Sequence, residues 1–211
     1  MEINTIGIII LAISFLGYIS NWLNWRFLNY KANQWLYYLG AFVHETSHAI
    51  FCFLMRAKIS EYKIFTSQPH VSYSKPRVKL IGDFLISIAP IIGGLTFLFF
   101  VNKYLLTNNF IMPEFSSWQS LPTDFLQFIK QIDITKWQNW LALFFFFNVG
   151  AMISPSWQDL KNVWLVMIIL LFIPWNFFTH LGLLAVSLIL INIILQIILI
   201  IIISILKFFK K

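Results

Sequence analysis

The sequence predicts an all-α polytopic membrane protein with about six transmembrane helices and a short strand or hairpin at the membrane face. Of its 211 residues, 59% are hydrophobic and only 11% are charged. Several apolar stretches reach the length of about 20 residues that a helix needs to cross a bilayer. No internal repeat or low-complexity linker divides the chain, so we expect a single membrane-embedded domain over residues 1–211.

Six stretches are expected to span the membrane, each an apolar run bounded by polar residues. They are residues 6–23, 35–55, 79–101, 138–153, 161–175 and 181–206. The first is expected to be a retained helix, because it is long, no basic residue precedes it and no small-residue cleavage site follows it. Pro174 separates the last two stretches, since proline ends a helix.

Two segments between these spans have structure of their own. Residues 56–77 are polar and alternate in places between Ile59 and Phe65, a pattern typical of a short strand or hairpin. The longest loop, residues 102–137, is expected to carry a short amphipathic helix near Thr123–Ile132.

The net charge of +7 is explained best by basic residues retained on the cytoplasmic side of a membrane. Nucleic acid is not an expected partner, because no basic stripe lies on a soluble face. A cytoplasmic N-terminus leaves ten of the fifteen basic residues inside: Arg56, Lys58, Lys63, Lys75, Arg77, Lys79, Lys161, Lys207, Lys210 and Lys211. We therefore expect an integral protein of a prokaryotic cytoplasmic membrane, embedded in the lipid bilayer with both termini cytoplasmic.

The residues His44-Glu45-Thr46-Ser47-His48 lie inside the second apolar stretch and indicate a metal site. Two histidines four positions apart lie on one face of a helix. Both imidazoles can then bind one zinc ion, and Glu45 can act on a coordinated water as general base. Ionisable groups are costly at membrane depth, which also indicates a functional site.

A catalytic zinc usually has three protein ligands, so the chain must supply a third. Asp159 is the favoured candidate, because Pro155 and neighbouring small residues interrupt the apolar run there and let a carboxylate enter the helix bundle. Asp159 is equally suited to the start of a helix, and the two roles are compatible. Asp83 and His180 are the alternatives, whereas His70 lies in a polar loop.

The stretch His44–Ile50, with a later Asn, Pro and Asp, resembles the site-2 protease family of intramembrane zinc metalloproteases. The resemblance implies that His44, His48 and Asp159 bind zinc and that Glu45 activates water. It also implies that Asn148 and Pro155 shape the segment that holds substrate near the metal.

The similarity extends to residues 87–94, which are like the small-residue third span of that family. Three features depart from the family pattern. Leu160 stands where the family has glycine after the aspartate, and Gln158 stands where leucine is common. Asn148 precedes Asp159 by a longer spacing than usual. The chain is thus expected to be a divergent member.

The expected activity is zinc-dependent hydrolysis of peptide bonds in membrane-associated or transmembrane substrates. An extended substrate is expected to pair with a strand of the 56–77 segment by strand addition. The alternative is a non-catalytic zinc-binding membrane protein, either a transporter or an inactive protease homologue that acts as a scaffold. A transporter would be expected to carry further acidic residues or histidines in its other spans. A histidine-rich di-iron site would need more than the four histidines present.

Overall fold

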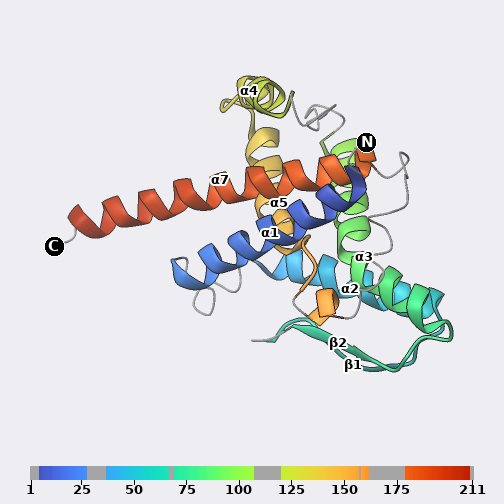
Figure 1. Ribbon diagram of the computed structural model, residues 1–211. Coiled ribbons are helices and arrows are strands. Elements are labelled where there is room, and N and C mark those ends of the chain that lie inside the picture. The colour runs from blue at the N-terminus through green and yellow to red at the C-terminus, as the bar shows by residue number, and fades with distance from the viewer. Residues whose placement is uncertain are drawn as a thin grey trace.

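The structure, a computed structural model, describes residues 5–27, 37–66, 69–106, 120–156, 158–161 and 179–209. This part of the chain is mostly helical and includes one two-stranded hairpin (Figure 1). Its elements are α1 (Thr5–Arg26), α2 (Tyr38–Leu54), β1 (Ile59–Lys63), β2 (His70–Tyr73), α3 (Lys79–Phe100), the π-helical segment η2 (Val101–Leu105), α4 (Leu121–Gln131), α5 (Trp137–Met152) and α7 (Thr179–Phe209).

Helices α1 and α7 lie side by side and run in the same direction, and α7 extends well beyond the end of α1 (Figure 1). Gly182 allows close packing near the start of the pair, because a Cβ there would come within 2.4 Å of the Ile9 side chain. Further along, Ser20 of α1 donates a hydrogen bond of 3.1 Å to Asn192 of α7. In both contacts, Ile9 with Gly182 and Ser20 with Asn192, the residue of α7 follows that of α1 by nearly the same number of positions, as two parallel helices require.

Buried polar side chains fix the register of this pair. The side-chain amide of Gln196 donates to Ser20 Oγ at 2.9 Å and to Asn24 Oδ1 at 3.1 Å. Tyr37, just before α2, donates to the same Asn24 oxygen at 2.8 Å. Asn192 donates to the Phe147 carbonyl of α5 at 2.7 Å. In an apolar interior such bonds hold helices in one arrangement, and here they join α1 and α7 to the helices around the candidate site.

Helices α2, α3 and α5 pack together closely where glycine removes a side chain. A Cβ on Gly40 of α2 would lie 2.1 Å from the Asn148 carbonyl oxygen of α5. A Cβ on Gly93 of α3 would lie 1.8 Å from Ser47 Oγ of α2. Small residues at helix contacts let backbones approach in this way. Helices α3 and α5 therefore pack closely against the segment of α2 that carries the histidine motif.

The hairpin and the amphipathic helix were both predicted, and both are present. Strands β1 and β2 form an antiparallel pair in which Glu61 faces Ser72 and Lys63 faces His70, with an irregularity between Ile59 and Glu61. Helix α4 lies close to the predicted range and buries Phe128 against Phe146 of α5.

The prediction of six membrane-spanning helices is wrong for the described part of the chain. Two helices there are long and apolar enough to cross a membrane, Lys79–Leu105 and Gly182–Phe209. Helix α2 has 17 residues and α5 has 16. At 1.5 Å per residue these reach only about 26 and 24 Å, less than the roughly 30 Å hydrocarbon core.

The other expected spans lie partly or wholly outside what is described. In α1, the side chains are described without a gap only over residues 11–24. That stretch is shorter than the 18 residues over which a membrane span is recognised. The predicted span over 161–175 lies outside the described residues except for its first position. Helix α2 is shorter than the apolar run over 35–55, whereas α5 matches the predicted span over 138–153, which is itself too short to cross the bilayer.

Candidate metal centre

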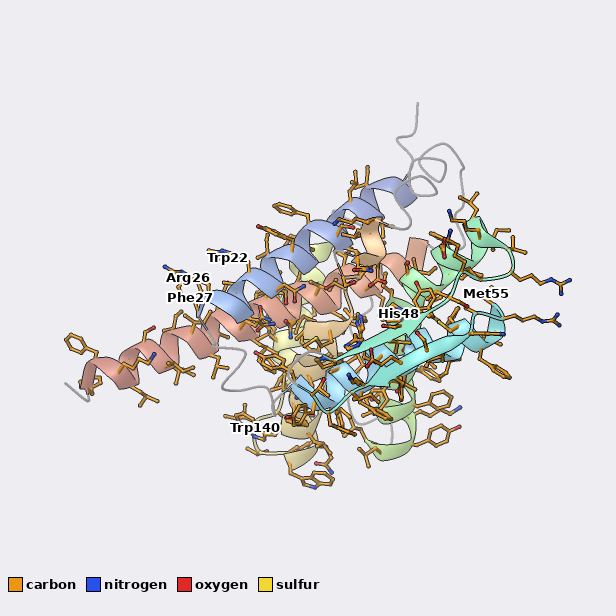
Figure 2. All side chains as sticks on the ribbon, turned by 90° about the horizontal axis from the view of Figure 1, so that it is seen from below. Trp22, Arg26, Phe27, His48, Met55 and Trp140 are labelled. Carbon is orange, nitrogen blue, oxygen red and sulfur yellow. The ribbon has the colours of Figure 1, made fainter. Side chains whose placement is uncertain are left out.

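Helix α2 presents both motif histidines toward the same point, as the spacing of four predicts. The Nε2 atoms of His44 and His48 are 3.2 Å apart, and their ring centroids are separated by 4.8 Å. His48 is buried in the body of the molecule, while Met55, just past the end of α2, lies near its edge (Figure 2). Two imidazole nitrogens that face each other at this distance suit two ligands of one ion.

Asp159 lies next to these histidines, although 111 positions separate it from His48 (159 − 48). Its Oδ2 atom is 3.6 Å from His48 Nε2. His44, His48 and Asp159 each have a potential ligand atom within 4.8 Å of those of the other two residues. The tertiary structure thus brings the predicted ligand trio together.

Two of the three ligand-to-ligand distances fit a tetrahedral zinc site. Zinc bonds of 2.0–2.2 Å to nitrogen and oxygen imply ligand-to-ligand distances of about 3.3 to 3.6 Å. The separations of 3.2 Å between the histidine nitrogens and 3.6 Å from His48 to Asp159 are close to that range. The full set of three ligand atoms lies within 4.8 Å, so His44 and Asp159 would move closer together on binding one ion. Three protein ligands of this kind leave a fourth position for water, the arrangement of a catalytic site.

The second nitrogen of each histidine contacts a backbone carbonyl. The Nδ1 atom of His44 is 2.5 Å from the Met152 oxygen at the end of α5. The Nδ1 atom of His48 is 2.8 Å from the Ile86 oxygen of α3. With the proton on Nδ1, each ring donates to its carbonyl and turns an unprotonated Nε2 toward the metal position. Such outer contacts orient metal-binding histidines.

Asp159 also lies in the helical turn over 158–161, so both of its predicted roles are compatible with the geometry. Its Oδ2 accepts hydrogen bonds from the Ser156 backbone N–H at 2.8 Å and from Ser156 Oγ at 2.6 Å. The Asp159 N–H donates back to Ser156 Oγ at 3.2 Å. This reciprocal pair is a capping box, and it holds the carboxylate near His48.

Glu45 is buried beside the trio and contacts the hairpin. The Val71 backbone N–H of β2 lies close enough to the Glu45 carboxylate to interact with it favourably. On the neighbouring position of α2, Thr46 Oγ1 lies 2.8 Å from the Tyr62 hydroxyl of β1. The hairpin therefore contacts α2 at the predicted general base and at the residue that follows it.

The exposed end of the hairpin carries its own charge cluster. Glu61 contacts Lys63 at 2.5 Å and His70 at 3.0 Å. The Lys63 ammonium, and after it the His70 imidazole, hold the pKa of Glu61 below its usual range. His70 is thus paired with Glu61, in accord with its exclusion as a zinc ligand. Asp83 lies on the first turns of α3, and the side chain of His180 lies outside the described residues.

The structure places the two predicted substrate-binding residues near the trio without giving them a substrate contact. Asn148 is buried in α5, and its side-chain amide donates to the Phe144 carbonyl of the same helix at 3.0 Å. Pro155 is half-buried in the break between α5 and the turn that carries Asp159. Their roles in substrate binding stay predictions.

Sequence reasoning missed the three backbone groups that surround the motif: the carbonyls of Ile86 and Met152 and the N–H of Val71. Backbone groups leave no residue-type signal, although Pro90 inside α3 was a clue that a carbonyl of that helix is free. No protein-family model, curated protein or solved structure matches the chain.

Proposed function

We propose that the chain is an intramembrane zinc metalloendopeptidase of the site-2 protease type, which cleaves peptide bonds of membrane-associated or transmembrane proteins. The observation that carries the proposal is the convergence of His44 Nε2, His48 Nε2 and an Asp159 carboxylate oxygen beside the buried Glu45. The resemblance in the sequence supports it, as do the two helices long and apolar enough to cross a membrane.

The residues of the trio would hold zinc through two neutral imidazoles and one carboxylate. Bound zinc supplies a water of lowered pKa and polarises the scissile carbonyl. Glu45 would take a proton from the attacking water and pass it to the leaving amine. The Val71 N–H contacts the Glu45 carboxylate and would hold it in place for that transfer.

An extended substrate segment fits the hairpin better than a helix does, because strand pairing exposes the peptide bonds to attack. Just past the end of β2, the Ser74 N–H donates to the carbonyl of Lys58, the residue before β1, at 2.8 Å, so the backbone groups of Ser72 also face β1. Those of Val71 and Tyr73 then face away from β1, and the Val71 N–H contacts Glu45. The outer edge of β2 is therefore the edge that borders the site.

We infer that the protein is embedded in a prokaryotic cytoplasmic membrane, with the bilayer and a membrane protein or peptide as its partners. Its low charge content and long Ile, Leu and Phe runs support this location. The loop between α2 and α3 is basic and suits the cytoplasmic side.

Metal content tests the proposal directly. We expect about one zinc per chain in the purified wild type and in Glu45→Gln, and clearly less in Asp159→Ala, because Asp159 is a proposed ligand and Glu45 is not. Cleavage of a membrane substrate is expected to drop in both variants. Absence of zinc from the folded wild type would refute the metalloprotease. Full zinc with undiminished cleavage in Glu45→Gln would remove Glu45 as the base.

A normal zinc content without any cleavage by the wild type would favour the non-catalytic alternative, a zinc-binding transporter or scaffold. Zinc retained in Asp159→Ala would direct the search for the third ligand to Asp83 and His180.

A further inference from the structure

We propose that Pro90 is a positioning residue for the metal centre, because it releases the backbone carbonyl that orients His48. The inference rests on the proposed zinc site. It concerns a part of α3 that supplies no ligand and no reacting group.

The relation between the two residues follows from helix geometry. In an α-helix, the N–H of one residue donates to the carbonyl four positions earlier. Pro90 lies inside α3, and the residue four positions before it is Ile86. The ring nitrogen of proline carries no hydrogen, so position 90 cannot donate to the Ile86 carbonyl.

The released carbonyl is used by the metal centre. His48 Nδ1 lies 2.8 Å from the Ile86 oxygen. Ile86 and Pro90 are both fully buried, so water cannot readily satisfy that oxygen. Buried carbonyls almost always have a partner, and here the partner is the histidine. The contact places a proton on Nδ1 and leaves Nε2 to face His44 and Asp159.

A residue with a backbone N–H at position 90 would compete with His48 for the same oxygen. The helix would gain its missing bond, and the His48 ring would lose the acceptor that sets its tautomer and rotation. Proline is otherwise the least favourable residue inside a helix. A local cost of this kind is expected where a functional site gains from it.

The site of His44 shows the same principle by a different route. The Ser156 N–H would reach the Met152 carbonyl if α5 continued, but it donates to Asp159 instead. The Met152 oxygen is then available to His44 Nδ1. Each histidine is thus oriented by a carbonyl that the interruption of a helix has released.

The test compares zinc affinity among Pro90→Ala, Pro90→Val and wild type, measured by competition with a chelator. Both substitutions restore the N–H, while valine nearly keeps the volume of the proline ring. We expect zinc binding to weaken by about 10- to 100-fold in both, the usual effect of losing such an outer contact. Helix content and thermal stability should not fall, since both residues are better helix formers than proline.

Two further readouts separate orientation of the histidine from general packing. The visible d–d bands of the Co²⁺-loaded protein are expected to change in both Pro90 variants, because they report the geometry of the ligand set. Pro122→Ala is the matched control. Pro122 is exposed in the first turn of α4, where its missing N–H would have no helical partner. Its zinc affinity and Co²⁺ bands should equal those of the wild type.

The outcomes distinguish this inference from the proposed function. If the wild type binds zinc and both Pro90 variants bind it equally well, the role of Pro90 is refuted and the zinc site stands. If alanine weakens binding and valine restores it, ring packing is responsible and the carbonyl argument is refuted. If the folded wild type binds no zinc, the proposed function fails first.

Discussion

At the scale of single residues, each proposed ligand of the candidate site also contacts a second group that is not a ligand. Asp159 faces His48 and also closes a capping box with Ser156. His44 and His48 each use one ring nitrogen for a carbonyl and turn the other toward the metal position. Outer contacts of this kind fix ligand orientation before the ion binds. Their removal should weaken zinc binding without removing a ligand.

Ser156→Ala tests that expectation for Asp159. The change removes the hydroxyl that donates to Asp159 Oδ2 and accepts from the Asp159 N–H. We expect a loss of about 1 kcal/mol in the free energy of unfolding from the missing cap. We also expect zinc affinity to weaken by about 10-fold, measured by chelator competition.

The control for this substitution is Ser204→Ala. The Ser204 hydroxyl is exposed on α7 and donates only to the Ile200 carbonyl of its own helix at 2.8 Å. That change should leave zinc affinity unaltered. Unaltered affinity in Ser156→Ala as well would show that Asp159 is oriented without its cap.

At the scale of elements, the hairpin is part of the site as well as a surface feature. Strand β2 turns one edge toward β1 and the other toward α2, where the Val71 N–H contacts Glu45. An isolated two-stranded hairpin is marginally stable in water. The contact between Thr46 and Tyr62 and the contact between Glu45 and Val71 attach it to α2. Substrate pairing and placement of the base therefore involve the same strand.

Val71→Pro is predicted to impair cleavage while the zinc site stays intact. Proline removes the N–H that contacts Glu45, and it leaves the ladder to β1 in place because that N–H faces away from β1. We expect kcat/KM to fall by about 100-fold, as a misplaced catalytic group can cause. Cleavage of a membrane substrate and zinc content should be measured together.

Val71→Ala is the matched control, since it truncates the side chain and keeps the N–H. It should retain most of the activity. Equal activity in the alanine and proline variants, with both proteins folded, would show that the β2 edge has no part in the reaction.

At the scale of the whole molecule, the parallel course of α1 and α7 bears on membrane topology. We predicted both termini on the cytoplasmic side from the distribution of basic residues. In the structure, the two helices run in the same direction, so the start of α1 and the end of α7 lie at opposite ends of the pair (Figure 1). If both helices cross the bilayer, the two ends of the chain must lie on opposite sides.

Fusions of compartment-sensitive reporters to each terminus test this arrangement. We expect a reporter active only in the cytoplasm and one active only outside it to report opposite sides for the two termini. A control with each reporter at each terminus separates location from poor expression. Both termini on one side would mean that α1 and α7 do not both cross the membrane.

The features that the sequence determined by itself are local. Alternation in residues 59–65 predicted the strand, polar and apolar spacing predicted α4, and the spacing of His44 and His48 placed two ligands on one helix face. Each depends on residues within one or two turns of one another, where side-chain direction follows from backbone periodicity.

The tertiary structure decided what depends on distant segments. It brought Asp159 to His48, directed the carbonyls of Ile86 and Met152 to the histidines, and made α1 and α7 parallel. It also made α2 shorter than the apolar run over 35–55 that suggested a full span. Hydropathy measures the residues of a segment, whereas the end of a helix depends on where its backbone groups find other partners. Those partners come from packing, which one segment of sequence does not contain.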